Sequence, residues 1–395
     1  MDTLNQRLSN TLQDLRAAGT YKRLRRITAP MGPVTHIEGV GEVLVFCSNN
    51  YLGLANHPQV IAAAKVGLER YGAGTASVRF ICGSFDCHHR LEEKLADFLG
   101  TQAALTYTSC WNANEGLLPA LVEAGDAIVS DASNHASIID ATRLSSATRK
   151  VFTHADMTSL AERLNEVRDA PVKLVVTDGV FSMEGDVADL QEMVKVCRAH
   201  GATVVVDDSH GTGVLGSNGR GSHEHCALAS RGPDGIDIIT STLGKALGGG
   251  NGGFVAGSKD LIEYLIQRSR PHLFSNALAP VTACAALEAL NILEREPERV
   301  ARLHDNVSTM RNGLRALGFN VMDSPSGIIP IMIGDTADAI KLSDRLLDRG
   351  IFVVGFGFPV VPEGQARLRV QMSSAHTDAH IDRALDAFAV LKHEY

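Results

Sequence analysis

Three segments of the sequence place chemically reactive side chains directly after short apolar runs. Asp207 ends the run ATVVVD and His210 follows three residues later, while Lys245 comes shortly after the run DIITST. The third segment is TSCWNANEG at 108–116, which reads as a strand-to-helix turn. Apolar runs of this kind predict strands of a parallel sheet, and ligands bind beyond the carboxyl ends of such strands. We therefore expect the three segments to line one crevice.

These segments supply the groups that a pyridoxal-phosphate site requires. A lysine amine forms an imine with the cofactor aldehyde, and a buried carboxylate keeps the pyridine nitrogen protonated. The phosphate is bound by first-turn amides of a helix and by hydroxyl groups. Lys245, Asp207, the turn 109–112 and Thr242 are of these types. From spacing alone, an exposed lysine and an aspartate that caps a turn remain open alternatives.

The elements that position these residues alternate along the chain. Helical patterns at 58–71, 87–99, 112–124, 157–168 and 187–200 are interleaved with the apolar runs AALTYT, DAIVS, KLVVTD, ATVVVD and DIITST. This alternation predicts an α/β layer with a mostly parallel sheet covered on both faces. Further helices are expected at 258–269 and 277–316.

The pattern of predicted strands and helices changes in the last quarter of the sequence. Apolar runs at 328–333, 351–354 and 367–371 are combined with helical patterns at 336–349 and from about 378. We interpret this part as a smaller α+β domain. The predicted division is an N-terminal helix and strand segment at 1–50, a large domain at 51–293 and a small domain at 294–395.

Composition excludes several classes of function. The 395 residues carry a net charge of -8 with both signs scattered, whereas nucleic-acid binding needs a basic face. Seven irregularly spaced cysteines do not indicate a disulfide framework. No apolar run is long enough to span a membrane, and the first ten residues lack the apolar core of a signal peptide. We expect a cytoplasmic protein that binds neither nucleic acid nor membrane.

Three patterns resemble other kinds of site but lack a necessary feature. The GxGxxG match at 211–216 is followed by SNGRGSH, a loop rather than the helix of a dinucleotide site. The cluster Cys82, Cys87, His88 and His89 lacks metal-ligand spacing, so no metal is expected. The glycines at 248–253 are not followed by the GK[ST] of a P-loop.

Longer motifs carry a resemblance over most of the chain. They are CSNNYLGLANHP (47–58), SVRFICGS (77–84), SDASNHASIID (130–140), TDGVFSMEGD (177–186), VVVDDSHGTG (204–213), TLGKALGG (242–249), RSRPHLFSNALAP (268–280) and GQARLRVQMSSAHT (364–377). In these motifs and their order the sequence resembles the α-oxoamine synthases, which are fold-type-I pyridoxal-phosphate transferases. SVRFICGS and RSRPHLFSN point to members that condense glycine with acetyl-CoA, giving 2-amino-3-oxobutyrate and CoA.

The resemblance implies roles for matching residues. Lys245 would form the imine with the cofactor and move the Cα proton, Asp207 would pair with the pyridinium nitrogen, and His135 would stack on the ring. The remaining cofactor contacts implied are Ser182 and His210 near the phenolic oxygen, and Cys110, Trp111, Thr242 and, from a partner subunit, Ser275 at the phosphate. Relatives usually have Phe at the position of Trp111, a change that a backbone donor tolerates.

The resemblance also implies that Arg369, assisted by Asn50, binds the carboxylate of the amino acid. Arg367 competes for this role, since the two side chains share one face of a strand. A homodimer with shared active sites is implied as well. Alternatives are a sister synthase that uses another acyl-CoA or amino acid, a plain aminotransferase, and a non-catalytic partner subunit, which would lack the lysine.

Overall fold

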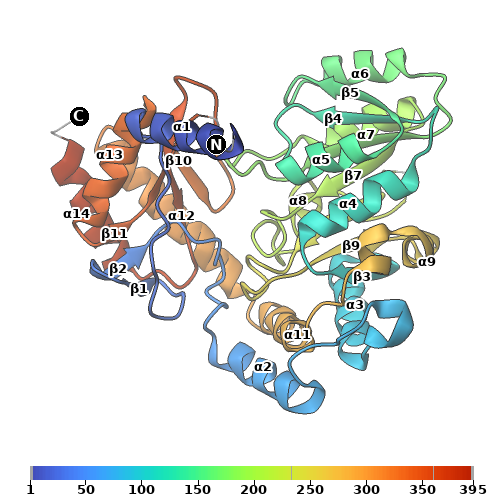
Figure 1. The fold of residues 1–395 in the computed structure, drawn as a ribbon, viewed down its shortest axis with the longest axis horizontal. Coiled ribbons are helices and arrows are strands. Elements are labelled where there is room, and N and C mark those ends of the chain that lie inside the picture. The colour runs from blue at the N-terminus through green and yellow to red at the C-terminus, as the bar shows by residue number, and fades with distance from the viewer. Residues whose placement is uncertain (1–2, 233, 359, 393–395) are drawn as a thin grey trace. The chain divides into compact units, whose positions relative to one another are not determined.

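The computed structural model describes residues 3–232, 234–358 and 360–392, and these form two compact units (Figure 1). The larger unit contains Asn49–Ser182 and Asp186–Leu303, and the smaller contains the segment up to Ser48, Met183–Gly185 and the segment from His304 onward. The three-part division predicted from sequence remains a prediction. No helix among the described residues is long and apolar enough to cross a membrane.

The larger unit is built on a seven-stranded sheet of order β3-β9-β8-β7-β6-β4-β5. Strand β9 runs opposite to the other six, which are parallel to one another, so the predicted mostly parallel α/β fold is confirmed. The strands are β3 (Ala103–Tyr107), β4 (Ala127–Asp131), β5 (Thr148–Phe152), β6 (Lys173–Asp178), β7 (Thr203–Asp207), β8 (Ile238–Thr242) and β9 (Gly253–Gly257).

Helices α4, α5 and α9 each present an apolar face to this sheet. Buried side chains of α4, α5 and α9 form one core cluster with alternate residues of the strands, including Val176, Val205 and Val255. The helices of this unit are α2 (Pro58–Tyr71), the π-helix η1 (Arg79–Gly83), α3 (Asp86–Leu99), α4 (Cys110–Leu121), α5 (Ala136–Leu144), α6 (Met157–Glu166), α7 (Leu190–Ala199), α8 (Ser222–His225), α9 (Lys259–Arg268), α10 (Arg270–Phe274) and α11 (Pro280–Arg295).

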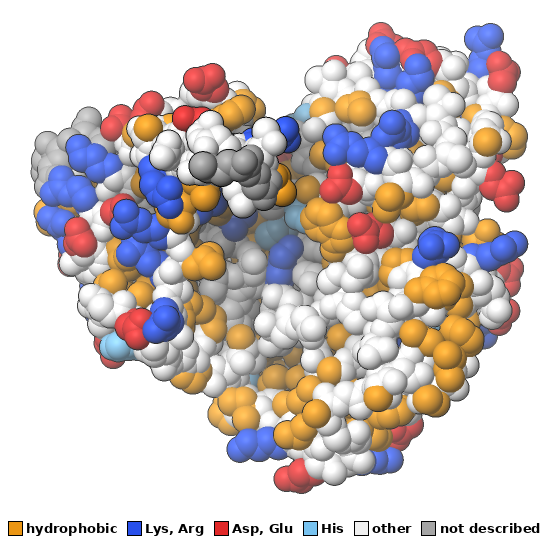
Figure 2. Space-filling view, in the orientation of Figure 1, with side chains coloured by type: hydrophobic (Ala, Val, Ile, Leu, Met, Phe, Trp, Pro, Cys, Tyr) orange, Lys and Arg blue, Asp and Glu red, His pale blue; other side chains and the backbone are white. Residues whose placement is uncertain are grey.

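The smaller unit contains two three-stranded sheets, of order β1-β2-β11 and β10-β13-β12. Its strands are β1 (Val34–Ile37), β2 (Gly41–Val45), β10 (Ile328–Gly334), β11 (Ile351–Phe352), β12 (Val354–Phe356) and β13 (Ala366–Gln371). Its helices are α1 (Thr3–Ala17), α13 (Thr336–Leu347) and α14 (Asp378–Lys392), while α12 (Glu298–Ala316) begins in the larger unit and ends in the smaller. On the face drawn in Figure 2, acidic and basic side chains are interspersed.

Two predicted elements differ from the structure. The helical pattern at 277–316 is two helices, because Pro297 stands between α11 and α12 and proline supplies no amide to continue a helix. The run 351–354 divides between β11 and β12, which belong to different sheets. The sequence pattern also missed the strands β1, β5 and β9, the helix α5 and the short helices η1, α8 and α10.

Candidate active site

The carboxyl ends of the neighbouring strands β6, β7 and β8 lie side by side at one end of the large sheet. Asp178 is in register with Asp207 on the neighbouring strand, and Asp207 with Thr240 on the next. Lys245 follows the end of β8 by three residues, in a partly buried turn. The structure therefore brings the predicted lysine and carboxylate to the same sheet edge.

The carboxylate of Asp207 is buried and held by hydrogen bonds on both oxygens. The Asn114 side-chain amide donates to Oδ2 at 2.7 Å, and the Ser209 amide donates to Oδ1 at 3.0 Å. Asn114 is itself fixed, because it also donates to the Ser137 hydroxyl at 2.9 Å and accepts from the Thr240 hydroxyl at 2.9 Å. These bonds fix the direction of the carboxylate before any ligand binds.

Burial and the charges of Lys245 and Asp207 shift the pKa values of two neighbouring groups, Asp178 and Cys110. Burial raises the pKa of Asp178 well above its usual value, and the charge of Asp207 adds to this, while Lys245 acts in the opposite direction. Burial and then Asp207 raise the pKa of the Cys110 thiol, again opposed by Lys245. Lys245, Asp207, Asp178 and Cys110 thus share one low-dielectric neighbourhood, where a charged ligand interacts strongly.

His135 is presented as a neutral ring at the N-cap of α5. Burial lowers its pKa, with Asp207 raising it less, so the imidazole is uncharged at neutral pH. Its Nδ1 lies 2.9 Å from the Ser137 hydroxyl, and its backbone amide donates to Asp178 Oδ2 at 2.7 Å. The Trp111 ring meets it edge-on, with centroids 6.0 Å apart. A neutral ring held in this way is suited to stacking on a flat ligand.

The turn 108–110 leads into α4, whose first turn can bind an anion. Cys110 and Trp111 are the first two helical residues, and the N-cap Ser109 accepts a hydrogen bond from the Asn112 amide at 3.1 Å. Gly253 allows the close approach of β9, since a Cβ there would lie 2.3 Å from the Cys110 nitrogen. The amides at the start of a 12-residue helix and the helix dipole together favour a phosphate group.

Thr242 is the last residue of β8, while His210 and Ser182 lie on the loops that follow β7 and β6. The Thr242 hydroxyl donates to the Gly252 carbonyl at 3.1 Å and accepts from the Gly244 amide at 3.0 Å. His210 is buried, with Nδ1 2.8 Å from the Tyr51 hydroxyl. Ser182 lies in the 180–187 turn, whose base is closed by a bridge between Val180 and Val187.

Two further predicted residues lie in other parts of the larger unit. Asn50 is buried, and its side-chain oxygen accepts from the Ala55 amide at 3.1 Å. Ser275 is exposed at the C-cap of α10 and lines a small pocket with Arg79 and Tyr107. The role of Ser275 in a partner's site remains a prediction.

The smaller unit distinguishes the two arginines of β13. Arg367 donates to Glu184 Oε1 at 2.7 Å, to the Met183 carbonyl at 3.3 Å and to the Gln365 carbonyl at 3.1 Å. Arg369 lies with its guanidinium carbon 4.7 Å from the centroid of the Phe356 ring and donates to Gln371 Oε1 at 3.2 Å. Arg367 is thus engaged by Glu184, and the assignment of the substrate carboxylate to Arg369 remains a prediction.

Sequence reasoning missed three residues that organise this site. Asn114 orients Asp207, Asp178 anchors His135, and Tyr51 bonds to His210. Asn114 stands inside TSCWNANEG and Asp178 inside TDGVFSMEGD, so both lay within segments already singled out. Their partners are 43 or more positions away in sequence, so only the fold shows the contacts.

Comparison with known proteins identifies the kind of site. A family model described as aminotransferase class I and II matches residues 41–388. The 2-amino-3-ketobutyrate coenzyme A ligase of Escherichia coli K12 is 50% identical over 386 residues, covering 97% of this chain and 96% of that protein. The 8-amino-7-oxononanoate synthase of Thermoanaerobacter pseudethanolicus is 44% identical over 382 residues, covering 96% and 95%.

A solved structure shares the fold over the whole chain. It is SPT with its PLP internal aldimine, with a TM-score of 0.94 and 33% identity, covering 100% of this chain and 99% of that one. The similarity therefore includes a protein with pyridoxal phosphate attached.

Proposed function

Since the chain belongs to the class I and II aminotransferase family and, within it, to the α-oxoamine synthases, we propose that it is a glycine C-acetyltransferase. The reaction joins glycine to the acetyl group of acetyl-CoA and releases CoA and 2-amino-3-oxobutyrate. One observation carries the proposal: a chain 50% identical to a 2-amino-3-ketobutyrate coenzyme A ligase places Lys245, buried Asp207 and the start of α4 around one sheet edge.

The residues present fit pyridoxal phosphate. Lys245 supplies the amine, Asp207 a buried carboxylate for the ring nitrogen, and His135 a neutral ring for the ring face. The first turn of α4 and the Thr242 hydroxyl supply donors for the phosphate. Ser182 and His210 are proposed to lie near the phenolic oxygen. When bound, pyridoxal phosphate acts as an electron sink for charge that develops at the substrate Cα.

The chain's own groups orient glycine and move its proton. We assign the glycine carboxylate to Arg369, with Asn50 assisting, because a guanidinium fork fixes both position and direction. A fixed carboxylate determines which Cα–H bond is presented for cleavage. Lys245 is proposed to accept that proton, since an amine that bonds covalently to the cofactor lies beside the reacting carbon.

The overall exchange balances without an external oxidant or reductant. The glycine Cα loses a proton and forms a bond to the acetyl carbonyl carbon, while the bond from that carbon to sulfur breaks. The CoA sulfur leaves with the electron pair and takes up a proton. In the reverse direction the same groups would cleave the oxo acid with CoA, which is the direction that threonine degradation requires. Participation in that pathway and a cytoplasmic location are predictions.

Substrate choice gives the direct test of the proposed reaction. We expect kcat/KM to favour glycine over serine and acetyl-CoA over pimeloyl-CoA, each by about 10- to 200-fold, the discrimination that one poorly fitting group costs. The measurement follows free thiol release from purified protein with each amino acid and acyl-CoA in turn. A preference for pimeloyl-CoA or serine would contradict the proposed reaction but would leave the assignment to the family unchanged.

A sister synthase is the second candidate, and a specific observation favours it. The synthase of Thermoanaerobacter pseudethanolicus is 44% identical, close to the 50% of the ligase. Identity alone therefore separates the two reactions weakly, and the substrate comparison decides between them. A non-catalytic partner subunit is disfavoured, because Lys245 and Asp207 are both present at the sheet edge.

We also propose a homodimer whose subunits complete each other's sites, with Ser275 binding the partner's cofactor phosphate. Ser275 is exposed within one chain, as a residue that acts in a partner's site must be. Lys245→Ala and Ser275→Ala homodimers should each have low activity, and mixing them should restore up to about a quarter of wild-type activity through one intact site per heterodimer. No recovery after subunit exchange, or an active monomer in sedimentation, would contradict this arrangement.

A further inference from the structure

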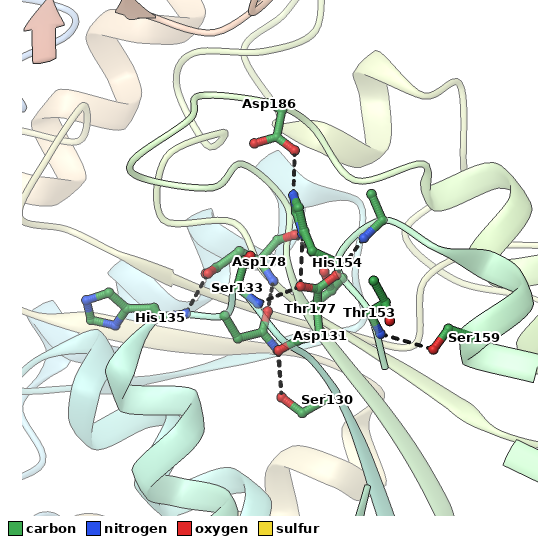
Figure 3. A network of polar contacts seen from close by, with 12 residues as sticks. Ser130, Asp131, Ser133, His135, Thr153, His154, Ser159, Thr177, Asp178 and Asp186 are labelled. Carbon is green, nitrogen blue, oxygen red and sulfur yellow. Dashed lines mark hydrogen bonds and ion pairs between the residues drawn. The ribbon is translucent and has the colours of Figure 1, made fainter. Parts of the chain in front are cut away.

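A histidine outside the proposed catalytic set bridges two carboxylates in the larger unit (Figure 3). His154 Nδ1 lies 2.9 Å from Asp131 Oδ1, and its Nε2 lies 3.0 Å from Asp186 Oδ2. The ring also packs edge-on against Phe181, with centroids 4.3 Å apart. With both ring nitrogens facing carboxylates, the geometry requires both to be donors, which is the protonated form.

The three residues lie at or just beyond the carboxyl ends of three neighbouring strands. Asp131 ends β4, His154 follows β5, and Asp186 lies in the 180–187 turn that follows β6. These strands are neighbours in the order β6-β4-β5. A cation at His154 therefore joins the loops after β4 and β6, because each carries one of its carboxylate partners.

Hydrogen bonds along the loop after β4 connect Asp131, the first partner of His154, to His135. Asp131 Oδ1 accepts from the Ser133 amide at 2.8 Å, and Oδ2 from the Ala155 amide at 3.2 Å. Next along the loop, Asn134 donates to the Ser130 hydroxyl at 2.9 Å and accepts from the Asp178 amide at 2.8 Å. These bonds fix the 131–135 loop, whose last residue is proposed to stack on the cofactor ring.

Backbone contacts within the turn after β6 connect Asp186, the second partner of His154, to the segment that contains Ser182. The Phe181 amide donates to the Asp186 carbonyl at 3.0 Å, and Val180 bridges Val187. The four residues 182–185 are thus enclosed between paired ends. Holding the Asp186 side chain holds the end of the turn that lies opposite Ser182.

Electrostatics agree with this geometry. Only 2% of the Asp131 side chain is exposed, and a carboxylate buried so deeply requires a charged or hydrogen-bonded partner. Hydrogen bonds to Asp131 and then Asp186 raise the pKa of His154 to about 10, which outweighs the effect of its burial. The imidazole is therefore charged throughout the neutral range.

We propose that His154 is a positioning residue that ties the loops after β4 and β6 together and thereby sets His135 and Ser182 in place for the cofactor. The role in cofactor binding rests on the proposed function, while the coupling of the two loops does not. His154 itself contacts Asp131, Asp186 and Phe181 and acts through them.

The test compares His154→Gln with a control variant that removes a similar ion pair. The control pair lies at the amino ends of the strands of the same sheet, away from His154. Arg198 bonds Asp237 at 2.9 and 3.0 Å, and Asp237 accepts from the Val204 amide at the start of β7. The Arg198 and His154 side chains are both 28% exposed, so Arg198→Gln removes a similar cation far from the proposed cofactor site. Asp186→Asn, which keeps the side-chain shape, serves as a second variant if His154→Gln fails to fold.

We expect four results for His154→Gln that Arg198→Gln does not show. The cofactor dissociation constant rises about tenfold, the visible absorption band of the bound cofactor shifts, and kcat falls by about 10- to 100-fold, as a displaced group near the reacting centre commonly causes. Hydrogen exchange in cofactor-free protein becomes faster at 131–135 and 180–187. Unchanged exchange in both loops, or cofactor affinity and kcat equal to those of Arg198→Gln, overturns the proposal. A wild-type protein that binds no pyridoxal phosphate refutes the proposed function instead, and the exchange experiment still decides whether His154 couples the loops.

The pH dependence follows from the raised pKa. A group whose folded pKa exceeds its unfolded value of 6.5 contributes stability that is fully present below pH 6.5 and is lost as pH rises towards about 10. The carboxylates that face the two ring nitrogens of His154 are those of Asp131 and Asp186. The difference in Tm between wild type and His154→Gln should therefore narrow between pH 6.5 and pH 10, and a constant difference would contradict the bridging cation.

Discussion

Lys245→Ala should lower turnover by about 10⁴-fold or more, because the change removes both the amine that attaches the cofactor and the group proposed to move the Cα proton. The remaining contacts, Asp207 and the first turn of α4, should still bind the cofactor, so the variant should be inactive although it is loaded. Turnover measured as thiol release with glycine and acetyl-CoA, together with the absorption spectrum, checks both parts.

The control for this variant is Lys195→Ala. Lys195 lies on α7 with 71% of its side chain exposed, in an ion pair with Glu192. An exposed ion pair of this kind contributes little to stability, so this variant should retain full activity. Lys245→Ala protein with turnover similar to that of Lys195→Ala would remove Lys245 from the catalytic role.

Asp207→Asn should retain the cofactor and lose about 10²- to 10⁴-fold in kcat. Without a carboxylate, the pyridine nitrogen loses the partner that keeps it protonated, and the ring becomes a weaker acceptor of electrons. The structure predicts a second effect. Both carboxylate oxygens now accept hydrogen bonds, from Asn114 and from the Ser209 amide, so an asparagine must turn its NH₂ group towards one of these donors. That mismatch should cost about 1–3 kcal/mol of stability.

The neighbouring carboxylate provides the matched control. Asp208 is buried and accepts from the Thr212 hydroxyl at 3.1 Å and the Ser222 amide at 3.1 Å. Asp208→Asn should therefore lose stability while the spectrum of the bound cofactor stays that of wild type. Equal kcat losses in both variants, with unchanged spectra, would show that Asp207 acts only structurally.

The sequence predicted the large sheet well where strands are continuous apolar runs, as in β6 (KLVVTD) and β7 (TVVVD). It missed β5 (TRKVF), an edge strand with exposed polar residues, and β9 (GFVAG), which is rich in glycine. Neither has the pattern of a buried strand, and each pairs with a strand from another part of the chain, β5 with β4 and β9 with β3. Tertiary pairing overrides local preference in such strands.

The site was predictable in its reactive groups but not in the groups that orient them. Lys245 and Asp207 stand at predicted strand ends, so their meeting followed from the rule for parallel sheets. The resemblance implied Arg369 rather than Arg367, but the ion pair that engages Arg367 joins it to Glu184, 183 positions away in sequence. His154 likewise stood in an unremarkable sequence, because its partners Asp131 and Asp186 are 23 and 32 positions away.

The most direct test of the account is to locate the cofactor on the chain. Purified protein would be loaded with pyridoxal phosphate, reduced with borohydride, digested and mapped by mass spectrometry, with unreduced protein as control. We predict one phosphopyridoxyl group per chain, on Lys245, in the peptide containing TLGKALGG. A label on another lysine, or no label on a protein that nevertheless releases thiol from acetyl-CoA with glycine, would contradict it.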